Sequence, residues 1–181
     1  MYRHAVYIVL VEEPRESVNV ASKALEMMGL EVVGVSKSSL PIQCLDASRN
    51  QLEALCVTTI VRKLVSTELI ALGIVNHDAY VAGLNFVFGL ALPHLAVATV
   101  YTPRLRLGRV ELFDERLFKE VMHELGHVLG LEHCSNRLCV MSFSNSLLEV
   151  DLKRPAFCRR CFEKLVSLGL RPSPRVLLNS F

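Results

Sequence analysis

The sequence predicts an α/β protein, and three observations lead to this prediction. About half of the 181 residues are hydrophobic (51%), which is enough for one sizeable core. In the first half of the chain, short segments rich in Val and Ile alternate with segments whose apolar residues recur every three or four positions. After about residue 130 no clear period is seen until a last short helix. We therefore expect a sheet packed with helices, followed by a small irregular C-terminal region.

The N-terminal half contains the strands of the expected sheet. Residues 4–12 form the first predicted strand, which has the apolar character of a buried one. Ser17 can cap a helix that runs to Met28, and Gly29 is a suitable residue to end it. The same reasoning predicts a second helix at 48–66 and further strands at 30–35, 69–75, 84–92 and 95–101.

The second half begins with a helix that carries the most informative motif of the chain. Asp114 is a suitable N-cap for this helix, with Glu115 in its first turn. The helix must end near Gly130, because glycine adopts a positive φ without steric cost. A short last helix is expected at 158–168, and the two prolines of the tail (171–181) predict irregular structure there.

The bulk properties argue against several classes of function. The formal net charge is +2, which by itself favours neither nucleic-acid nor membrane binding. No apolar stretch reaches the roughly 18 residues of a membrane helix, and the first residues lack the cleavage site of a signal peptide. We therefore expect a cytoplasmic protein, monomeric by default. In that compartment cysteines are metal ligands or buried thiols before they are disulfides.

The segment HELGHVLGLEHC (123–134) predicts a catalytic zinc site. His123 and His127 are four residues apart on a helix, so both rings leave the same face. Glu124 is rotated by about 100° around the helix axis and points to the side of the metal where a water would lie. Gly130 lets the chain turn back, so that His133 can supply a third nitrogen. Three neutral ligands leave a fourth position open, as in catalytic zinc sites.

Four further cysteines predict a second, structural zinc site. The pattern is C-x4-C-x-M followed, after sixteen residues, by C-x2-C, and its cysteines are Cys134, Cys139, Cys158 and Cys161. Four thiolates in two close pairs make a closed tetrahedral site with no room for a substrate. Two disulfides or free thiols are the alternatives, and a reducing compartment disfavours the disulfides. Cys44 and Cys56 lack partners at metal spacing, so we expect them to be buried thiols.

The combined pattern, HExxHxxGxxHC-x4-C-x-M…CxxC, resembles that of the archaemetzincins (archaelysins), a branch of the metzincin metallopeptidases. The segment GLNFVFG (83–89) is also similar to that family, so the resemblance runs through most of the chain. It implies that Met141 forms the methionine turn beneath the metal. It also implies a metzincin-like fold, α/β with a mixed twisted sheet. One domain (1–181) would comprise an upper α/β subdomain with the active-site helix (1–130) and a lower subdomain with the methionine turn and the four-cysteine zinc (131–181).

The resemblance further implies zinc-dependent hydrolysis of peptide bonds, with two Zn²⁺ per chain and a peptide or protein substrate. Glu124 matches the family's general base, and Gly130 matches its turn. In metzincins an extended substrate pairs with an edge strand above the cleft. Residues 96–101 are the candidate here, with an ordinary core strand as an equal alternative. Some branches have a tyrosine two residues after the methionine, where this chain has Phe143; Tyr80 and Tyr101 are then candidate oxyanion donors by residue type alone.

Two other functions stay open on the sequence. The first is a zinc-binding protein of the same fold that turns over nothing, although the intact Glu124 argues against it. The second is a nucleic-acid binder that uses basic residues near the second CxxC, namely Lys153, Arg154, Arg159 and Arg160, although Asp151 and Glu163 dilute this charge. A cytoplasmic peptidase with no pro-segment would also need narrow specificity, short-peptide substrates or low activity.

Overall fold

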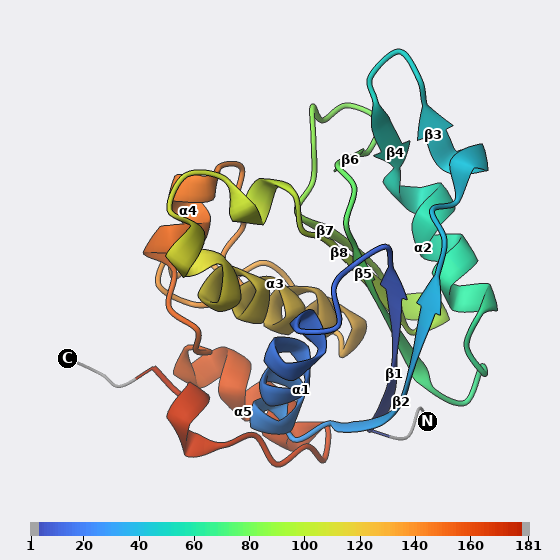
Figure 1. Cartoon of the computed structure of the whole chain (residues 1–181). Helices are drawn as coiled ribbons and strands as arrows, with labels where there is room; N and C mark the ends of the chain where they lie inside the picture. Colours follow the sequence, from blue (N-terminus) through green and yellow to red (C-terminus); the bar gives the residue numbers. More distant parts are fainter. Residues whose placement is uncertain (1–3, 179–181) are drawn as a thin grey trace.

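The computed structural model describes residues 4–178, in which a five-stranded sheet lies between two layers of helices (Figure 1). The strand order is β2-β1-β5-β8-β7. The first four strands are parallel, and β7 pairs antiparallel with β8 at one edge, so the predicted mixed sheet is confirmed. The bounds are β1 Ala5–Val11, β2 Glu31–Ser38, β5 Ile70–Val75, β7 Gly89–Leu92 and β8 Val97–Tyr101.

Three helices cover the sheet. Helices α1 (Ser17–Met28) and α3 (Phe113–Val128) pack on one face, and α2 (Ala54–Lys63) packs on the other (Figure 1). Side chains of β1 alternate between the two cores, with Ile8 and Leu10 on the side of α1 and α3 and Val9 on the side of α2. Every residue of β5 is buried, as expected for a central strand covered on both faces. This packing fixes α3 against β7 and β8. None of the helices within 4–178 is long and apolar enough to cross a bilayer.

A second, three-stranded sheet corrects the prediction of one long helix at 48–66. It comprises β3 (Leu45–Asp46), β4 (Gln51–Glu53) and β6 (Ala79–Tyr80), in the order β3-β4-β6. The helix α2 begins only at Ala54, because the Glu53 side chain accepts hydrogen bonds from the N–H groups of Leu55 and Cys56 and so caps it. The side chains of Arg49 and Gln51 donate to the carbonyl of Asn85, which ties this small sheet to the segment after β6.

The interpretation of Cys44 and Cys56 as separate buried thiols is wrong. They form a disulfide across a sequence separation of 12, with their Cα atoms 5.6 Å apart. The bond joins the 3₁₀ turn Ile42–Cys44 to the first turn of α2 and so closes the hairpin formed by β3 and β4. The prediction rested on metal-ligand spacing and on the redox compartment alone. Neither property reveals that the fold places these two thiols side by side.

Several predicted boundaries also differ. The predicted strand at 84–92 begins only at Gly89, and the segment before it is irregular. The strand β8 begins at Val97, because a 3₁₀ turn (Pro93–Leu95) and a left-handed Ala96 precede it. Leu112 rather than Asp114 is the N-cap of α3, and Asp114 lies in the first turn, where its charge suits the helix dipole.

The chain after Gly130 contains more helix than the sequence predicted. The short helix α4 (Leu147–Leu152) is capped by Ser146, whose side chain accepts from the N–H of Glu149, and α5 (Arg159–Ser167) agrees with the predicted last helix. The tail contains a 3₁₀ turn (Pro174–Val176) and a bridge between Leu177 and Phe157; residues 179–181 lie outside the described part. The core beneath α1 and α3 continues into this region through residues such as Val140 and Phe157. The division into subdomains at residue 130 stays a prediction.

Candidate metal centres

The helix α3 presents His123 and His127 side by side, each oriented by a backbone carbonyl. Nδ1 of His123 lies 2.8 Å from the carbonyl oxygen of Val140, and Nδ1 of His127 lies 2.8 Å from that of Leu131. A hydrogen bond from Nδ1 to a carbonyl leaves Nε2 unprotonated and free to bind a metal. The two Nε2 atoms converge to 3.1 Å. This is close to the separation of roughly 3.3 Å that two zinc-bound nitrogens have in a tetrahedral site.

The turn at Gly130 brings in the third histidine as predicted. Gly130 has φ +87°, and its N–H donates to the carbonyl of His127 while Leu131 N–H donates to that of Gly126. The ring of His133 then lies 5.3 Å from the ring of His123 and 4.7 Å from that of His127, measured between centroids. The three histidines can each offer a ligand atom within 4.8 Å of the others. Burial lowers the pKa of all three rings, most strongly for His123, which favours the neutral form that binds metals. The donor set therefore fits a zinc ion.

Glu124 lies between the histidine cluster and the edge strand β7. Its side chain is buried, and this burial raises the pKa of the carboxyl well above its usual range. The nearby carboxylate of Glu120 raises the pKa further, and Lys153 opposes the shift. A divalent cation on the histidines would favour the carboxylate form.

Met141 lies directly against α3, the helix that carries His123 and His127. It is fully buried, and its amide carbonyl accepts from the N–H of Cys134. A Cβ at Gly126 would collide with the Met141 sulfur, so the absence of a side chain at Gly126 allows this close approach. The methionine therefore packs beneath the helical turn that connects His123 and His127.

A buried ion pair lies at the floor of the same site. Nζ of Lys153 lies 2.9 Å from Oε1 of Glu120, and both side chains are almost fully excluded from solvent, with 1% and 3% exposed. Lys153 Nζ also lies 3.5 Å from the carbonyl of Ser142, next to the methionine. Because it is buried, Lys153 is not available to the basic group that the nucleic-acid alternative would use. Instead, Lys153 joins the segment after α4 to the active-site helix.

Removal of only one member of this pair should destabilise the protein strongly. Lys153→Met leaves the Glu120 carboxylate buried without its partner, which typically costs about 3–5 kcal/mol. The double variant Lys153→Met/Glu120→Leu should recover most of this loss, because an apolar pair requires no desolvated charge. Urea unfolding of the metal-loaded proteins measures both changes. Equal destabilisation in the single and double variants would show that the two charges are not coupled.

An open cleft of about 370 Å³ borders the histidines. Its upper wall is largely apolar and comprises residues of the 81–93 segment, namely Val81, Leu84, Phe86, Val87, Phe88, Gly89, Leu90, Ala91 and Pro93. Its floor holds Glu120, Glu124 and Lys153 with the three histidines, and Phe143, Ser144 and Asn145 line the lower side. The Phe143 ring packs on His133 with centroids 5.1 Å apart.

Neither tyrosine that the sequence suggested as an oxyanion donor lines this cleft. The Tyr80 hydroxyl donates to Asp46, and the buried Tyr101 hydroxyl lies against Thr99 and the carbonyl of Ala54 on the α2 side of the sheet. The hydroxyl of Ser144, by contrast, is buried beside the cleft and has no hydrogen-bond partner within 4–178. Nothing in the sequence motif marks Ser144, so it was not among the residues predicted to line the site.

The edge strand beside the cleft is β7 and not the segment 96–101. The strand β8 pairs with β5 on one side and β7 on the other, and all of its residues are buried, so the alternative of a core strand is correct for it. Within 4–178, β7 has no strand on its outer side. The N–H of Tyr101 donates to the carbonyl of Phe88, so Phe88 faces β8 with its backbone polar groups. In an antiparallel pair such residues alternate with residues whose N–H and C=O groups point outward. The N–H and C=O groups of Gly89 and Ala91 therefore point away from β8.

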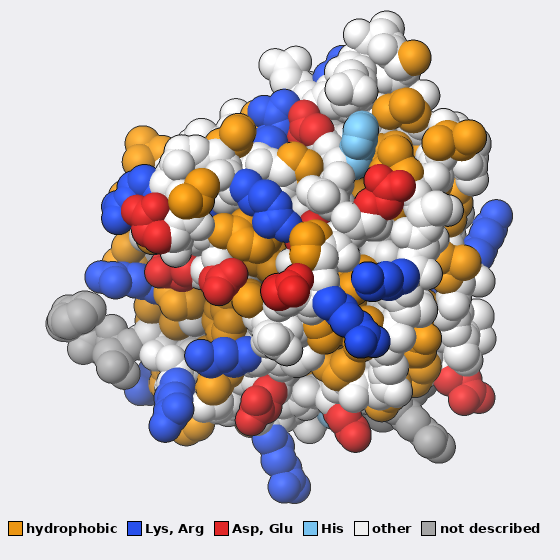
Figure 2. Space-filling view, viewed as in Figure 1, with side chains coloured by type: hydrophobic (Ala, Val, Ile, Leu, Met, Phe, Trp, Pro, Cys, Tyr) orange, Lys and Arg blue, Asp and Glu red, His pale blue; other side chains and the backbone are white. Residues whose placement is uncertain are grey.

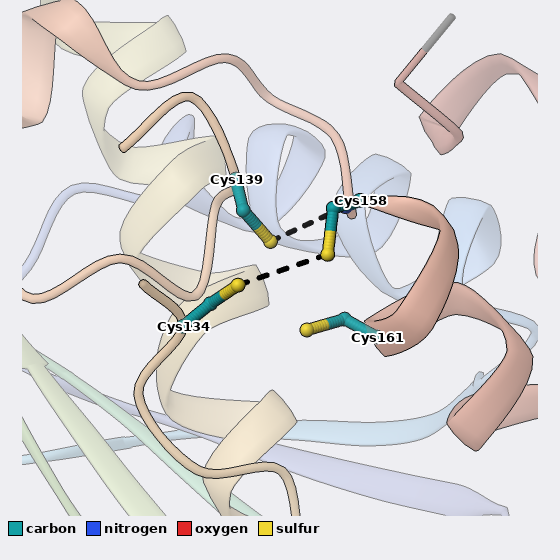
Figure 3. A group of neighbouring side chains, drawn as sticks. All are labelled: Cys134, Cys139, Cys158 and Cys161. Atoms are coloured by element: carbon teal, nitrogen blue, oxygen red, sulfur yellow. Dashed lines mark hydrogen bonds between the residues drawn. The ribbon is translucent and has the colours of Figure 1, made fainter. Parts of the chain in front are cut away.

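The four predicted cysteines meet at one point, as Figure 3 shows. Their sulfur atoms lie within 4.8 Å of one another. Sγ of Cys134 lies 3.7 Å from Sγ of Cys158, and the backbone N–H of Cys158 donates to Sγ of Cys139. A hydrogen bond from Cys161 lowers the pKa of Cys139 to about 5, and the same contact raises the pKa of Cys161. Four soft donors at this spacing fit a tetrahedral zinc ion and need no disulfide.

Comparison with known proteins shows to which family the chain belongs. The sequence model of peptidase family M54 matches residues 19–167. This chain belongs to peptidase family M54. The archaemetzincin of Aeropyrum pernix is 46% identical over 150 residues, which cover 81% of this chain and 82% of that protein.

Solved structures agree with this membership. The crystal structure of the archaemetzincin from Methanopyrus kandleri superposes with a TM-score of 0.83 at 38% identity, over 91% of this chain and 94% of that one. The archaemetzincin from Archaeoglobus fulgidus, in complex with malonate, gives a TM-score of 0.79 at 38% identity, over 88% of this chain and 99% of that one. The M54 chain is therefore a zinc metallopeptidase with the archaemetzincin fold, and the predicted resemblance is confirmed.

Proposed function

We propose that this M54 peptidase hydrolyses peptide bonds at the three-histidine site, with Glu124 as the general base. One observation carries the proposal: three histidine nitrogens converge beside a buried carboxylate at the floor of a cleft that runs along an open sheet edge. His123, His127 and His133 would hold the catalytic zinc, and the four cysteines would hold a structural one. Zinc at the histidines would polarise the scissile carbonyl and lower the pKa of water.

Glu124 would move the protons of the reaction. It takes one proton from the attacking water and delivers it to the leaving nitrogen. Burial supports this role, because a carboxylate in an apolar site is a stronger base than one in water. The Glu124 side chain lies directly against the backbone of β7 at Gly89, and it lines the same cleft as the three histidines.

The strand β7 would bind the substrate main chain. The outward N–H and C=O groups of Gly89 and Ala91 can pair with an extended peptide, which extends the sheet by one strand. Such pairing is independent of the substrate side chains. The apolar upper wall formed by Leu84, Phe86 and Leu90 favours apolar side chains on the peptide.

Substitution of Ala91 by proline tests this role of β7. The N–H of Ala91 points outward, so its removal should leave the sheet intact and weaken peptide binding, with KM raised up to about tenfold for the loss of one hydrogen bond. Steady-state kinetics on a peptide that the parent cleaves give this value. Leu90→Pro is the matched control: its N–H faces β8, so that variant should lose stability instead. An unchanged KM in a folded Ala91→Pro variant would place the substrate elsewhere.

A zinc ion on the four cysteines would stabilise the position of the residues at the catalytic zinc site. Cys134 is bonded to His133, and its N–H donates to the carbonyl of Met141 at 2.9 Å. Zinc on the four cysteines would join this turn to α5, so that both His133 and Met141 stay in place. Structural zinc sites of this kind contribute free energy of folding directly.

The two rival functions make different predictions. A non-catalytic zinc protein would bind both metals and cleave no peptide. A nucleic-acid binder has little support, because Lys153 is buried, and on the face shown in Figure 2 basic side chains are interspersed with acidic and apolar ones. Incubation of the zinc-loaded protein with a broad peptide library, read by mass spectrometry, decides between hydrolysis and metal binding alone.

A further inference from the structure

Gly89, the first residue of β7, faces the side chain of Glu124 at a distance that leaves no room for a side chain. A Cβ built on Gly89 would lie 2.5 Å from both Cγ and Oε1 of Glu124, and 2.6 Å from Cδ. Carbon atoms that are not bonded to each other normally stay about 3.5–4.0 Å apart. The Glu124 side chain therefore occupies the volume that any other residue at position 89 would fill.

The backbone of Gly89 does not itself require glycine. Its φ is not positive, unlike that of the turn glycines Gly29, Gly83, Gly108, Gly130 and Gly169. Glycine inside a strand weakens the strand, and it commonly marks a place where another group comes close to the backbone. At Gly89 that group is the carboxylate that would act as the base.

We propose that Gly89 is a positioning residue: its missing side chain forms the slot that sets the position of the Glu124 carboxylate for catalysis. This inference rests on the proposed role of Glu124. The Glu124 carboxylate has few other positions to take. Glu120 and Lys153 form a buried pair beside it, and Glu124 itself is only 6% exposed. A methyl group at position 89 would move the carboxylate by about 1 Å, since the backbone of β7 is held in the sheet by β8.

Gly89→Ala should lower kcat by about 10²-fold, the typical effect of a 1 Å misplacement of a catalytic group. KM should change little, because the outward N–H and C=O groups of β7 remain. In the Glu124→Gln background the same substitution should cost almost nothing, because no base is left to misplace. Gly89→Ala with the parent's kcat, or with equal losses in both backgrounds, would overturn the proposal.

A second readout needs no substrate. Cobalt(II) is introduced at the histidine site after mild chelation, with the cysteine site left in zinc, and its visible spectrum is followed with pH. A carboxylate beside the metal shifts the midpoint of this titration, so Gly89→Ala should move the midpoint toward that of Glu124→Gln. A midpoint equal to that of the parent would contradict displacement of Glu124. The titration can be measured even if the protein cleaves no peptide. Failure of the proposed function and failure of this inference are therefore distinguishable.

Thermal unfolding supplies the steric test. In the parent, Gly89→Ala should lower Tm, because the methyl group collides with Glu124. In the Glu124→Ala background the slot is empty, and the same substitution should raise Tm by about 1–4 °C, the usual gain from glycine to alanine at a compatible position. Gly73→Ala is a matched control, since its Cβ would crowd Thr99 and Val61 in β8 and α2 and not Glu124. A Tm that falls equally in both Glu124 backgrounds would overturn the proposal.

Discussion

Glu124→Gln is expected to lose at least about 10²-fold of any peptide hydrolysis while it keeps both metals and the fold. This is the lower end of the usual contribution of a general base. Glutamine has the shape of glutamate, so it still fits the slot opposite Gly89, but it cannot accept the proton of the attacking water. Peptides should still bind, because the open edge of β7 and the three histidines are unchanged. The measurement is the cleavage rate of a peptide found in the library experiment, with metal content determined by elemental analysis.

Two outcomes would contradict this assignment in different ways. A glutamine variant as fast as the parent would show that another group, or none, takes the proton. A parent that cleaves nothing in a broad library would leave the fold and the metal sites in place and favour the non-catalytic interpretation. Burial of Glu124 argues against the second outcome, because burying a carboxyl destabilises the fold and a site that cleaves nothing gains no compensating advantage from it.

The clustering of the three histidines and of the four cysteines could be predicted from the sequence, because their spacing is a local property of the chain. His123 and His127 lie on one helical face by the period of the helix, and Gly130 has the positive φ that the return to His133 needs. The cysteine pairs are likewise marked by short spacings, and the structure gathers all four. The alternation of strands and helices predicted an α/β sheet packed with helices, because buried strands and amphipathic helices have different apolar periods.

The features that the sequence did not predict depend on pairings between distant segments. Whether β7 or β8 is the edge depends on the strand order, which no local pattern encodes. Cys44 meets Cys56 only because a hairpin folds back on α2, and Lys153 is buried only because Glu120 lies opposite it. The contact between Gly89 and Glu124 is also of this kind, since a glycine in a strand does not reveal from its own sequence which group approaches it.

Cys158→Ser is expected to destabilise the whole protein far more than His133→Ala, although both remove one metal ligand. Cys158 lies at the start of α5, with its sulfur 3.7 Å from that of Cys134, so its loss breaks the connection between the turn after Gly130 and the last helix. Apparent binding of structural zinc amounts to about 10–16 kcal/mol in small zinc peptides, comparable with the entire stability of a typical domain. Loss of even part of this binding free energy should lower Tm sharply.

The two variants should also differ in the order in which metals are lost. His133→Ala removes a ligand from an exposed, open site, so the histidine metal should leave under mild chelation while Cys134 still holds the turn. In Cys158→Ser the cysteine metal should be lost first. The affinity of the histidine site should then fall as a consequence, because Cys134 is bonded to His133 and its N–H holds Met141. Zinc content and Tm, measured on both proteins across a chelator series, test this order. Equal destabilisation by the two substitutions, or a stable, metal-free protein with all four thiols free, would mean that the cysteine cluster does not support the fold through zinc.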